Sequence, residues 1–250
     1  MKKSKDIKIN LVEQPVQDAK TAILILPGGA YFFVSPTESE CVADKFNSLG
    51  YSAFVLKYSV FPHRYPTALL ETATAIKYIK DTYPALKNVV VCGFSAGGHL
   101  AGNISTQYNS PLVLSATNGA NVRPDAAILC YPLITFDKEF RHKGSFYCLC
   151  GNFNKKLKRS LSIEKIVTKD TPPMFIWHTK EDTCVPCQNS IMMAKALEDN
   201  GIAHKLMLFP HGPHGLSLAS PEAPVDKSFY FDDVAQWPNL AKEWLDTILK

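Results

Sequence analysis

Short, largely apolar runs alternate along the chain with stretches in which apolar positions follow helical spacing. The apolar runs predict buried strands at 22–26, 53–56, 89–92, 126–130, 174–177 and 205–209. Helical spacing predicts helices at 38–49, 67–83, 99–107, 188–200 and 238–249. Because continuous apolar runs are typical of parallel strands buried on both faces, this alternation predicts an α/β fold. We expect a mostly parallel central sheet with helices on both faces.

Residues 136–170 have the least regular pattern. They lie between two predicted strands and contain the neighbouring aromatic residues Phe146 and Tyr147. A basic cluster follows, formed by Lys155, Lys156, Lys158 and Arg159. Because long irregular segments are usually either functional or disordered, two interpretations stay open: a cap that shapes a substrate pocket, or a solvated surface excursion. The sequence shows no internal repeat or linker, so residues 1–250 are predicted to be one domain with 136–170 as the candidate cap insertion.

Composition narrows the classes of protein that this chain can represent. With 250 residues, 46% hydrophobic and 20% charged, it is expected to be an ordinary globular protein. The net charge of +4 is too small to indicate a nucleic-acid or membrane partner. No apolar run approaches the roughly 18 residues of a membrane span, and no apolar segment follows the N-terminal lysines as in a signal peptide. We therefore expect a cytoplasmic location, and the sequence leaves a homodimer open.

Seven cysteines, an odd number, indicate reduced thiols rather than a disulfide framework. Cys184 and Cys187 form a C-x-x-C motif, which raises the question of metal or redox chemistry. A structural metal site needs about four ligands, and no second C-x-x-C supplies them. The sequence therefore predicts two small, partly buried thiols here, with no metal and no cofactor.

The strongest chemical signal is the GFSAG motif at 93–97, which directly follows one predicted strand and precedes a helix. Strand, sharp turn and helix form the context of a nucleophile elbow, in which Ser95 is held in a strained conformation that exposes its hydroxyl. Side chains at Gly93 and Gly97 would collide at such a bend. The N–H of Ala96 lies at the start of the helix, where developing negative charge is favoured. The motif predicts Ser95 as a nucleophile, and the alternative is a tight glycine turn with a spectator serine.

A second signal is the PGGA motif at 27–30, directly after the first predicted strand. Adjacent glycines allow the backbone to approach a ligand closely. Alone, the motif is best explained as a glycine turn that leaves a strand. Together with the elbow, it predicts a two-donor oxyanion hole made by the N–H of Gly29 or Ala30 and that of Ala96.

A nucleophilic serine needs a base and an acid that orients the base. His211 and His214 follow the last predicted strand, at the edge of the sheet where α/β proteins place their sites. His99 is expected to point away from Ser95 because it lies one helical turn further on. The other histidines are interpreted as loop or strand-end residues: His63, His142, His178 and His204. The residues alone leave His211 and His214 open.

The acid is expected after the penultimate strand, where Glu181 and Asp182 stand. Asp182 is the first choice and Glu181 its rival. The chain order Ser95, Asp182 and a C-terminal histidine agrees with the order found where a serine elbow opens an α/β sheet. The alternative for Asp182 is an aspartate that caps a turn, which is common.

These motifs together resemble the α/β-hydrolase superfamily. More closely, they resemble the bacterial carbohydrate acetyl-esterase or short-chain lipase branch, including acetyl-xylan-esterase-like proteins. The matching stretches span about 22–219: LPGGAY with Ser35 and Glu38 soon after, YSVFPHRYP, CGFSAGGHLAG, TPPMFIWHTKEDTCVP and GPHGLSLA. The resemblance implies Ser95 as nucleophile, Asp182 as acid and His214 as base.

The resemblance also implies oxyanion donors at Gly29 or Ala30 and at Ala96. The chain departs from the family pattern at two positions of this loop. Many relatives have a histidine in place of Pro27 and a third glycine in place of Ala30. The extra methyl group at position 30 narrows the pocket or moves the donor.

The function implied is that of a serine hydrolase, which acts on short-chain carboxylic esters through an acyl-enzyme. Acetyl esters of sugars or xylo-oligosaccharides are the expected small-molecule substrates. Tyr31, Phe32 and Phe94 are the expected aromatic residues of the substrate pocket, with core packing as the alternative for each. Two other functions stay open: an aryl-formamidase or small peptidase with the same triad, and a non-catalytic homologue that binds a ligand.

Overall fold

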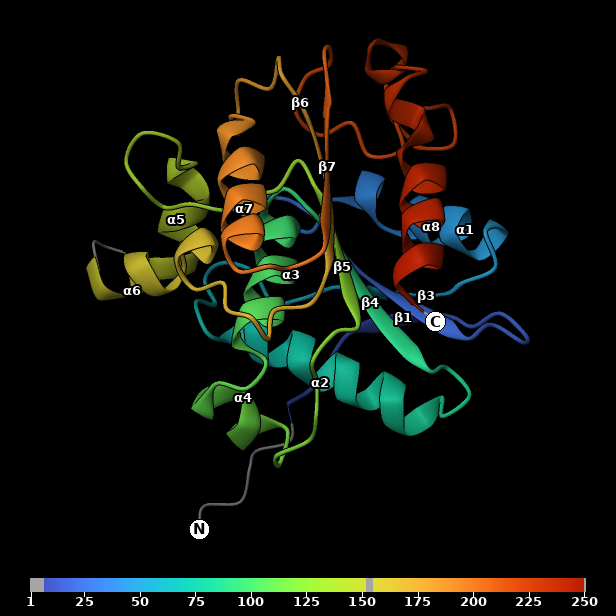
Figure 1. Ribbon diagram of the computed structural model, residues 1–250, viewed down its shortest axis with the longest axis vertical. Helices are drawn as coiled ribbons and strands as arrows, with labels where there is room; N and C mark the ends of the chain where they lie inside the picture. The colour runs from blue at the N-terminus through green and yellow to red at the C-terminus, as the bar shows by residue number, and fades with distance from the viewer. Residues whose placement is uncertain (1–6, 152–154, 250) are drawn as a thin grey trace.

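A twisted, mostly parallel sheet forms the centre of the computed structural model, which describes residues 7–151 and 155–249 (Figure 1). In these residues the sheet has seven strands in the order β1-β3-β2-β4-β5-β6-β7. β1 pairs antiparallel with β3, and all other neighbouring strands are parallel. The strands are β1 (Leu11–Gln14), β2 (Thr21–Leu26), β3 (Ser52–Leu56), β4 (Asn88–Phe94), β5 (Ala126–Cys130), β6 (Met174–Thr179) and β7 (His204–Phe209).

The six predicted strands and the predicted fold class are confirmed. β1 was not predicted, because its sequence LVEQ is short, half polar and only partly buried. An edge strand that borders only one neighbour has little need for a continuous apolar run. Its pairing with β3, Leu11 opposite Leu56, identifies it as a strand only once the neighbour is in place.

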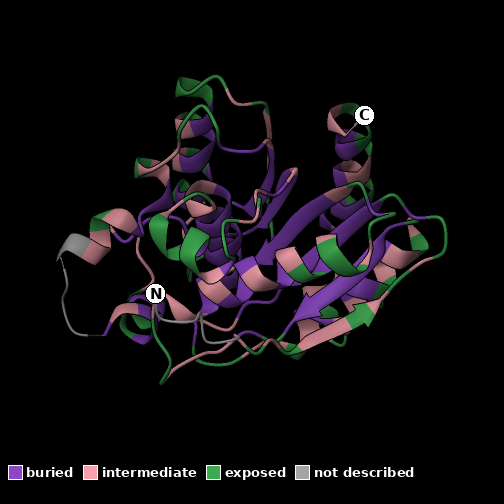
Figure 2. Ribbon diagram, turned by 90° about the horizontal axis from the view of Figure 1, so that it is seen from below, coloured by how far each residue is buried: buried purple, intermediate pink, exposed green. Residues whose placement is uncertain are grey.

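Alternate residues of the buried strands face two separate cores. Leu24 and Leu26 of β2 belong to the core that includes residues of α2, α3 and α7, whereas Ile23 and Ile25 belong to the core that includes residues of α1 and α8. Figure 1 shows these two groups of helices on opposite sides of the sheet, and Figure 2 shows the strands as mostly buried. The five predicted helices are present as α1 (Glu40–Ser48), α2 (Thr67–Thr82), α3 (Ala96–Gln107), α7 (Gln188–Asp199) and α8 (Trp237–Ile248).

The described part of 136–170 is more regular than its pattern suggests. It contains α5 (Lys143–Cys150), α6 (Lys155–Ser160) and a single turn of 3-10 helix (Ile163–Lys165), while residues 152–154 lie outside the described residues. The prediction of an irregular segment was therefore wrong for these helices. Short helices such as α5 and α6, and likewise α4 (Pro111–Ala116), leave little periodicity to detect and depend on tertiary contacts.

Tertiary contacts hold α5 against the body of the molecule. The ring of Phe146 packs edge-on against Phe136 at 5.0 Å between centroids, and Leu149 O accepts a hydrogen bond from Tyr65 N at 2.9 Å. The start of the helix is capped locally, since His142 Nδ1 accepts a hydrogen bond from Ser145 N. The role of this segment as a cap stays a prediction. Within 7–151 and 155–249, no helix combines the length and the apolar composition that a membrane crossing requires.

Candidate active site

Ser95 lies at the bend between β4 and α3. Its backbone angles are φ 51° and ψ −114°, a combination that residues with a side chain rarely adopt. Hydrogen bonds from both sides hold this conformation: Ser95 N donates to Cys130 O at 3.0 Å, and Ser95 O accepts from His99 N and Leu133 N at 3.1 Å. The neighbouring strand and helix therefore keep the serine hydroxyl at the carboxyl edge of the sheet.

The two glycines of the elbow leave no space for a side chain. A Cβ atom at position 93 would lie 2.2 Å from Gly97 O, and one at position 97 would lie 1.9 Å from Leu26 O. Since such atoms cannot approach closer than about 3 Å without a shift of the backbone, both positions require glycine. A side chain at either position would therefore collide with the backbone, as expected from the sequence. At position 97 it would collide with the end of β2.

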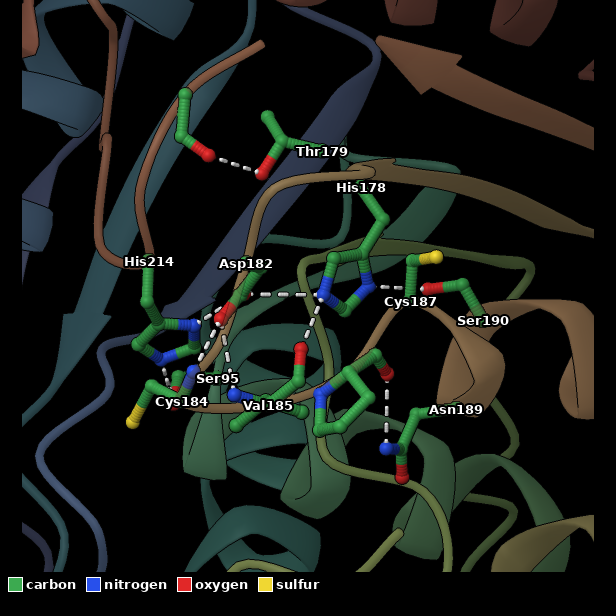
Figure 3. A network of polar contacts seen from close by, with 12 residues as sticks. Ser95, His178, Thr179, Asp182, Cys184, Val185, Cys187, Asn189, Ser190 and His214 are labelled. Carbon is green, nitrogen blue, oxygen red and sulfur yellow. Dashed lines mark hydrogen bonds and ion pairs between the residues drawn. The ribbon is translucent and has the colours of Figure 1, made fainter. Parts of the chain in front are cut away.

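The structure brings Ser95, Asp182 and His214 together from three parts of the chain (Figure 3). The distance from His214 Nε2 to Ser95 Oγ is 2.8 Å, and that from His214 Nδ1 to Asp182 Oδ2 is 2.6 Å. A carboxylate only accepts hydrogen bonds, so Nδ1 carries the proton of the neutral ring and Nε2 is free to accept the serine proton. This arrangement has the geometry of a serine nucleophile with its base and orienting acid.

The rival residues Glu181 and His211 contact each other instead. His211 Nδ1 lies 2.9 Å from Glu181 Oε1, and both side chains are exposed. Glu181 Oε2 also accepts a hydrogen bond from Gly212 N at 3.1 Å. They therefore form a surface pair beside the Asp182–His214 pair.

Asp182 is buried and accepts hydrogen bonds on both carboxylate oxygens. Oδ1 accepts from Cys184 N and Val185 N, each at 2.9 Å, and Oδ2 faces His178 and His214. Burial opposes ionisation, but the hydrogen bonds from His178 and His214 outweigh it and hold the pKa of the Asp182 carboxyl well below its usual range. The residue is therefore an anion that can stabilise a positive charge on His214.

His178 orients Asp182 from the side opposite His214. Its Nε2 lies 2.8 Å from Val185 O and 3.1 Å from Asp182 Oδ2, and its Nδ1 lies 2.7 Å from Ser190 Oγ. A carbonyl oxygen only accepts, so Nε2 carries the proton and the Ser190 hydroxyl donates to Nδ1. The sequence indicated only a strand-end histidine here, because no motif marks a residue that acts through an aspartate.

The loop after β2 lies against the serine. Gly29, Ala30 and Tyr31 have positive φ angles of 119°, 56° and 59°, and Gly29 and Ala30 line the same cavity as Ser95. Ala96 is buried at the start of α3, directly after the serine. These positions agree with the expected donors, whose role as an oxyanion hole remains a proposal.

The buried carboxylate of Glu38 connects the loop after β2 to the loop that carries His214. The sequence analysis gave this residue no role. Glu38 Oε2 accepts a hydrogen bond from Gly28 N at 2.7 Å, and Oε1 accepts one from Tyr131 Oη at 2.6 Å. Tyr131 Oη accepts from Ser217 N at 2.9 Å, and its ring lies edge-on to His214 at 5.1 Å. Burial raises the pKa of the Glu38 carboxyl, although the hydrogen bonds from Tyr131 and Gly28 oppose this shift.

A cavity of about 240 Å³ opens beside Ser95. Its wall is formed by residues from the loop after β2, the elbow, the segment 136–170 and the loops after β6 and β7. They are Gly29, Ala30, Phe33, Ser35, Thr37, Glu38, Ser95, His142, Cys184, His214 and Gly215. His142 therefore brings the candidate cap segment to the cavity, which the sequence analysis did not foresee.

None of the three aromatic residues expected in the pocket is among these wall residues. Tyr31 is buried, with its Oη 2.7 Å from His99 Nδ1. Phe94 is also buried and packs edge-on against Trp237, because its position on β4 faces the core beneath α8. Phe32 points to the surface. The core-packing alternative therefore holds for Tyr31 and Phe94.

The C-x-x-C pair differs from the expectation of two partly buried thiols. Cys184 is exposed and lines the cavity, whereas Cys187 is half-buried. Burial of the sulfur and the nearby charge of Asp182 raise the pKa of the Cys184 thiol, which therefore stays protonated at neutral pH. In the described ranges no group of three or more His, Cys, Asp and Glu side chains is arranged to hold a metal ion.

The fold and the elbow geometry define an α/β hydrolase. Residues 8–197 match the family model BD-FAE, and the chain belongs to this family. Relatives and solved structures also confirm the resemblance to acetyl-xylan-esterase-like proteins. An acetyl ester-xyloside bifunctional hydrolase from Caldicellulosiruptor lactoaceticus is 36% identical, with a TM-score of 0.85 over 96% of this chain and 88% of that one.

Two curated relatives are similar to most of this chain. Endo-1,4-beta-xylanase B of Butyrivibrio fibrisolvens is 35% identical over 81% of the chain, and an acetylxylan esterase of Xylanibacter ruminicola is 31% identical over 82%. The matched region is 33% and 43% of the length of these two proteins. The chain therefore spans less than half the length of either of these two relatives.

Replacing the acid should separate the two candidate carboxylates. Asp182→Asn is expected to lower kcat on p-nitrophenyl acetate by about 10⁴-fold, as in serine proteases, because His214 loses its orienting anion. Glu181→Gln is the matched control and should change kcat less than about twofold, since Glu181 contacts His211 and Gly212 N and no atom of Ser95, Asp182 or His214. Greater damage from Glu181→Gln would show that the acid is misassigned.

Glu38→Gln should reduce activity although Glu38 has no expected bond to the reacting atoms. An amide cannot accept from Gly28 N and Tyr131 Oη on both of its polar atoms, so the two loops are expected to shift. A shift of this kind should lower kcat/KM by up to about 100-fold. Steady-state kinetics with Glu222→Gln, an exposed glutamate, as control would test this, and unchanged kinetics would remove the positioning role.

The raised pKa of Glu38 also predicts a pH dependence of stability. The folded state holds the Glu38 proton more tightly than the unfolded state, whose pKa is about 4.3. The free energy of unfolding of the wild type, relative to Glu38→Gln, should therefore fall as pH rises above about 4.3 and level off above the folded pKa. Urea unfolding at a series of pH values measures this difference, and a constant difference would contradict the prediction.

Proposed function

We propose that this protein hydrolyses short-chain carboxylic esters, and acetyl esters of sugars or xylo-oligosaccharides in particular, through a covalent acyl-enzyme on Ser95. The observation that carries the proposal is the continuous contact from Ser95 Oγ through His214 to Asp182, at 2.8 Å and 2.6 Å. A half-buried serine hydroxyl within hydrogen-bond distance of an imidazole nitrogen is the arrangement that activates a hydroxyl nucleophile.

The reaction begins when His214 Nε2 removes the proton of Ser95 as Oγ attacks the ester carbonyl carbon. The negative charge on the carbonyl oxygen is stabilised by the N–H of Ala96 and by that of Gly29 or Ala30. The imidazolium, stabilised by Asp182, then protonates the leaving alcohol oxygen. Water, activated by the same nitrogen, attacks the acyl-enzyme and releases the carboxylic acid and the free serine.

The shape of the cavity supports a short acyl group. Its volume of about 240 Å³ lies below the roughly 300–1,000 Å³ of sites that enclose drug-sized ligands. Ser35, Thr37 and Glu38 provide polar atoms on its wall, and His142 provides one from 136–170, which supports that segment as a cap. Relatives described as an acetylxylan esterase and an acetyl ester-xyloside hydrolase support an acetylated sugar as the substrate.

Ser95→Ala is the direct test. We expect kcat on p-nitrophenyl acetate to fall by around 10⁶-fold and labelling by a fluorophosphonate probe to disappear, because the attacking oxygen is gone. Ser48→Ala, at an exposed position at the end of α1, is the control and should keep both properties. If Ser95→Ala retained most of its activity, the proposed nucleophile would be rejected.

The substrate class needs a separate panel. Acetylated xylo-oligosaccharides, p-nitrophenyl esters of increasing acyl length, N-formyl anilides and short peptides should be compared by kcat/KM. We expect acetyl esters to be preferred over longer acyl esters and over both kinds of amide. Preference for a formamide or a peptide bond would instead identify an aryl-formamidase or a peptidase with the same triad.

A further inference from the structure

Exposed aromatic side chains gather beside the cavity. Phe32, Phe33 and Tyr147 are 62%, 53% and 52% exposed, although they come from two distant parts of the chain. Phe61, which is half-buried, lies between Phe32 and Tyr147. We call Phe32, Phe61 and Tyr147 the aromatic strip. Large exposed apolar groups in one place usually mark a binding site.

The rings of the strip are arranged in sequence. Phe32 and Phe61 have centroids 6.4 Å apart and planes 29° apart, and Phe61 and Tyr147 follow at 6.2 Å and 35°. The guanidinium carbon of Arg64 lies 5.8 Å from the centroids of both Phe61 and Tyr147. The strip therefore combines neighbouring aromatic surfaces with the planar N–H donors of an arginine.

Backbone hydrogen bonds hold the three segments of the strip together. Phe61 N donates to Tyr31 O at 2.8 Å, which joins the loop that carries Phe61 to the loop that carries Phe32. Tyr65 N donates to Leu149 O at 2.9 Å, which joins the first of these loops to α5. A ligand that stacks on these rings would therefore meet a surface with little conformational entropy left to lose.

Two residues close in sequence to the strip line the cavity. Phe33, the neighbour of Phe32, lines the cavity wall, and so does His142, which caps the start of α5. Tyr147 lies five residues after His142, which corresponds to about 7 Å along a helix. One substrate can therefore have an ester in the cavity and further groups on the strip.

We propose that the aromatic strip binds pyranose rings of the sugar chain that carries the ester. The inference rests on the proposed function and adds to it that the preferred substrate is an oligosaccharide. The C–H faces of a sugar ring stack on the negative faces of aromatic rings, and sugar hydroxyls accept hydrogen bonds from a guanidinium. An acyl chain is a poorer match, since the exposed side chains of His63 and Arg64 lie on the same loop as Phe61.

The test compares two substrates on each variant. The ratio of kcat/KM for an acetylated xylotetraose to kcat/KM for p-nitrophenyl acetate should fall about tenfold in Tyr147→Ala and in Phe32→Ala. The change should lie mainly in KM for the oligosaccharide. Tyr147→Phe keeps the ring and should keep most of the ratio. Tyr78→Ala removes an exposed tyrosine of α2 and is the matched control, for which we expect an unchanged ratio.

A binding measurement gives a readout that does not depend on turnover. Ser95→Ala should bind unacetylated xylotetraose in isothermal titration, and the double variant Ser95→Ala, Tyr147→Ala should bind it about tenfold more weakly. Tyr147→Ala and Phe32→Ala change separate segments, so the test still works if one of these variants fails to fold. Circular dichroism would detect a variant that fails to fold.

Three results would overturn the inference while leaving the proposed esterase intact. The first is that the protein hydrolyses p-nitrophenyl acetate, but the ratio of kcat/KM for the two substrates is the same in Tyr147→Ala and Phe32→Ala as in the wild type. The second is a selective loss on long-chain acyl esters, which would identify the strip as an acyl site. The third is a change from dimer to monomer in both variants, which would identify it as an interface between two copies. Absence of all ester hydrolysis in the wild type would instead reject the proposed function.

Discussion

The strained backbone at Ser95 is the constraint on which the candidate site depends. A φ of 51° at a residue with a side chain costs free energy, and it persists only because surrounding groups leave no alternative. The carbonyl of Cys130 at the end of β5 and the amide of Leu133 just after it bind the Ser95 backbone, while Gly97 lies against the end of β2. Three strands that are distant in sequence therefore set the position of one hydroxyl group at the edge of the sheet.

The partners of Ser95 are positioned by buried polar groups rather than by the loops alone. Asp182 receives backbone N–H groups from its own turn and contacts His178, which is itself held by Ser190. Glu38 and Tyr131 connect the loop after β2 to the loop of His214. Buried polar groups are costly unless they are satisfied, so a network of this kind has few alternative arrangements. It gives flexible loops a defined geometry next to the nucleophile.

The same loops also place the cavity and the aromatic strip next to each other. The loop after β2 contributes Ala30 to the cavity and Phe32 to the strip, and His142 caps the start of α5, which carries Tyr147. A site built in this way can treat the acyl group and the alcohol separately. In the proposed reaction the partly open cavity would hold the acyl group, and the exposed aromatic strip would hold the sugar chain.

The sequence by itself determined the elements with strong local signals: six apolar strands, five helices, and the elbow whose glycines the bend requires. It also placed Ser95, Asp182 and His214 at strand ends, since chain order and strand position are local properties. Only the tertiary structure decided which side chains reach each other. In the folded chain Asp182 contacts His214, whereas Glu181 contacts His211. Tyr31 and Phe94 are buried in the cores. Glu38 and His178 lie at the site. These outcomes depend on contacts between residues far apart in the chain, and no local pattern carries that information.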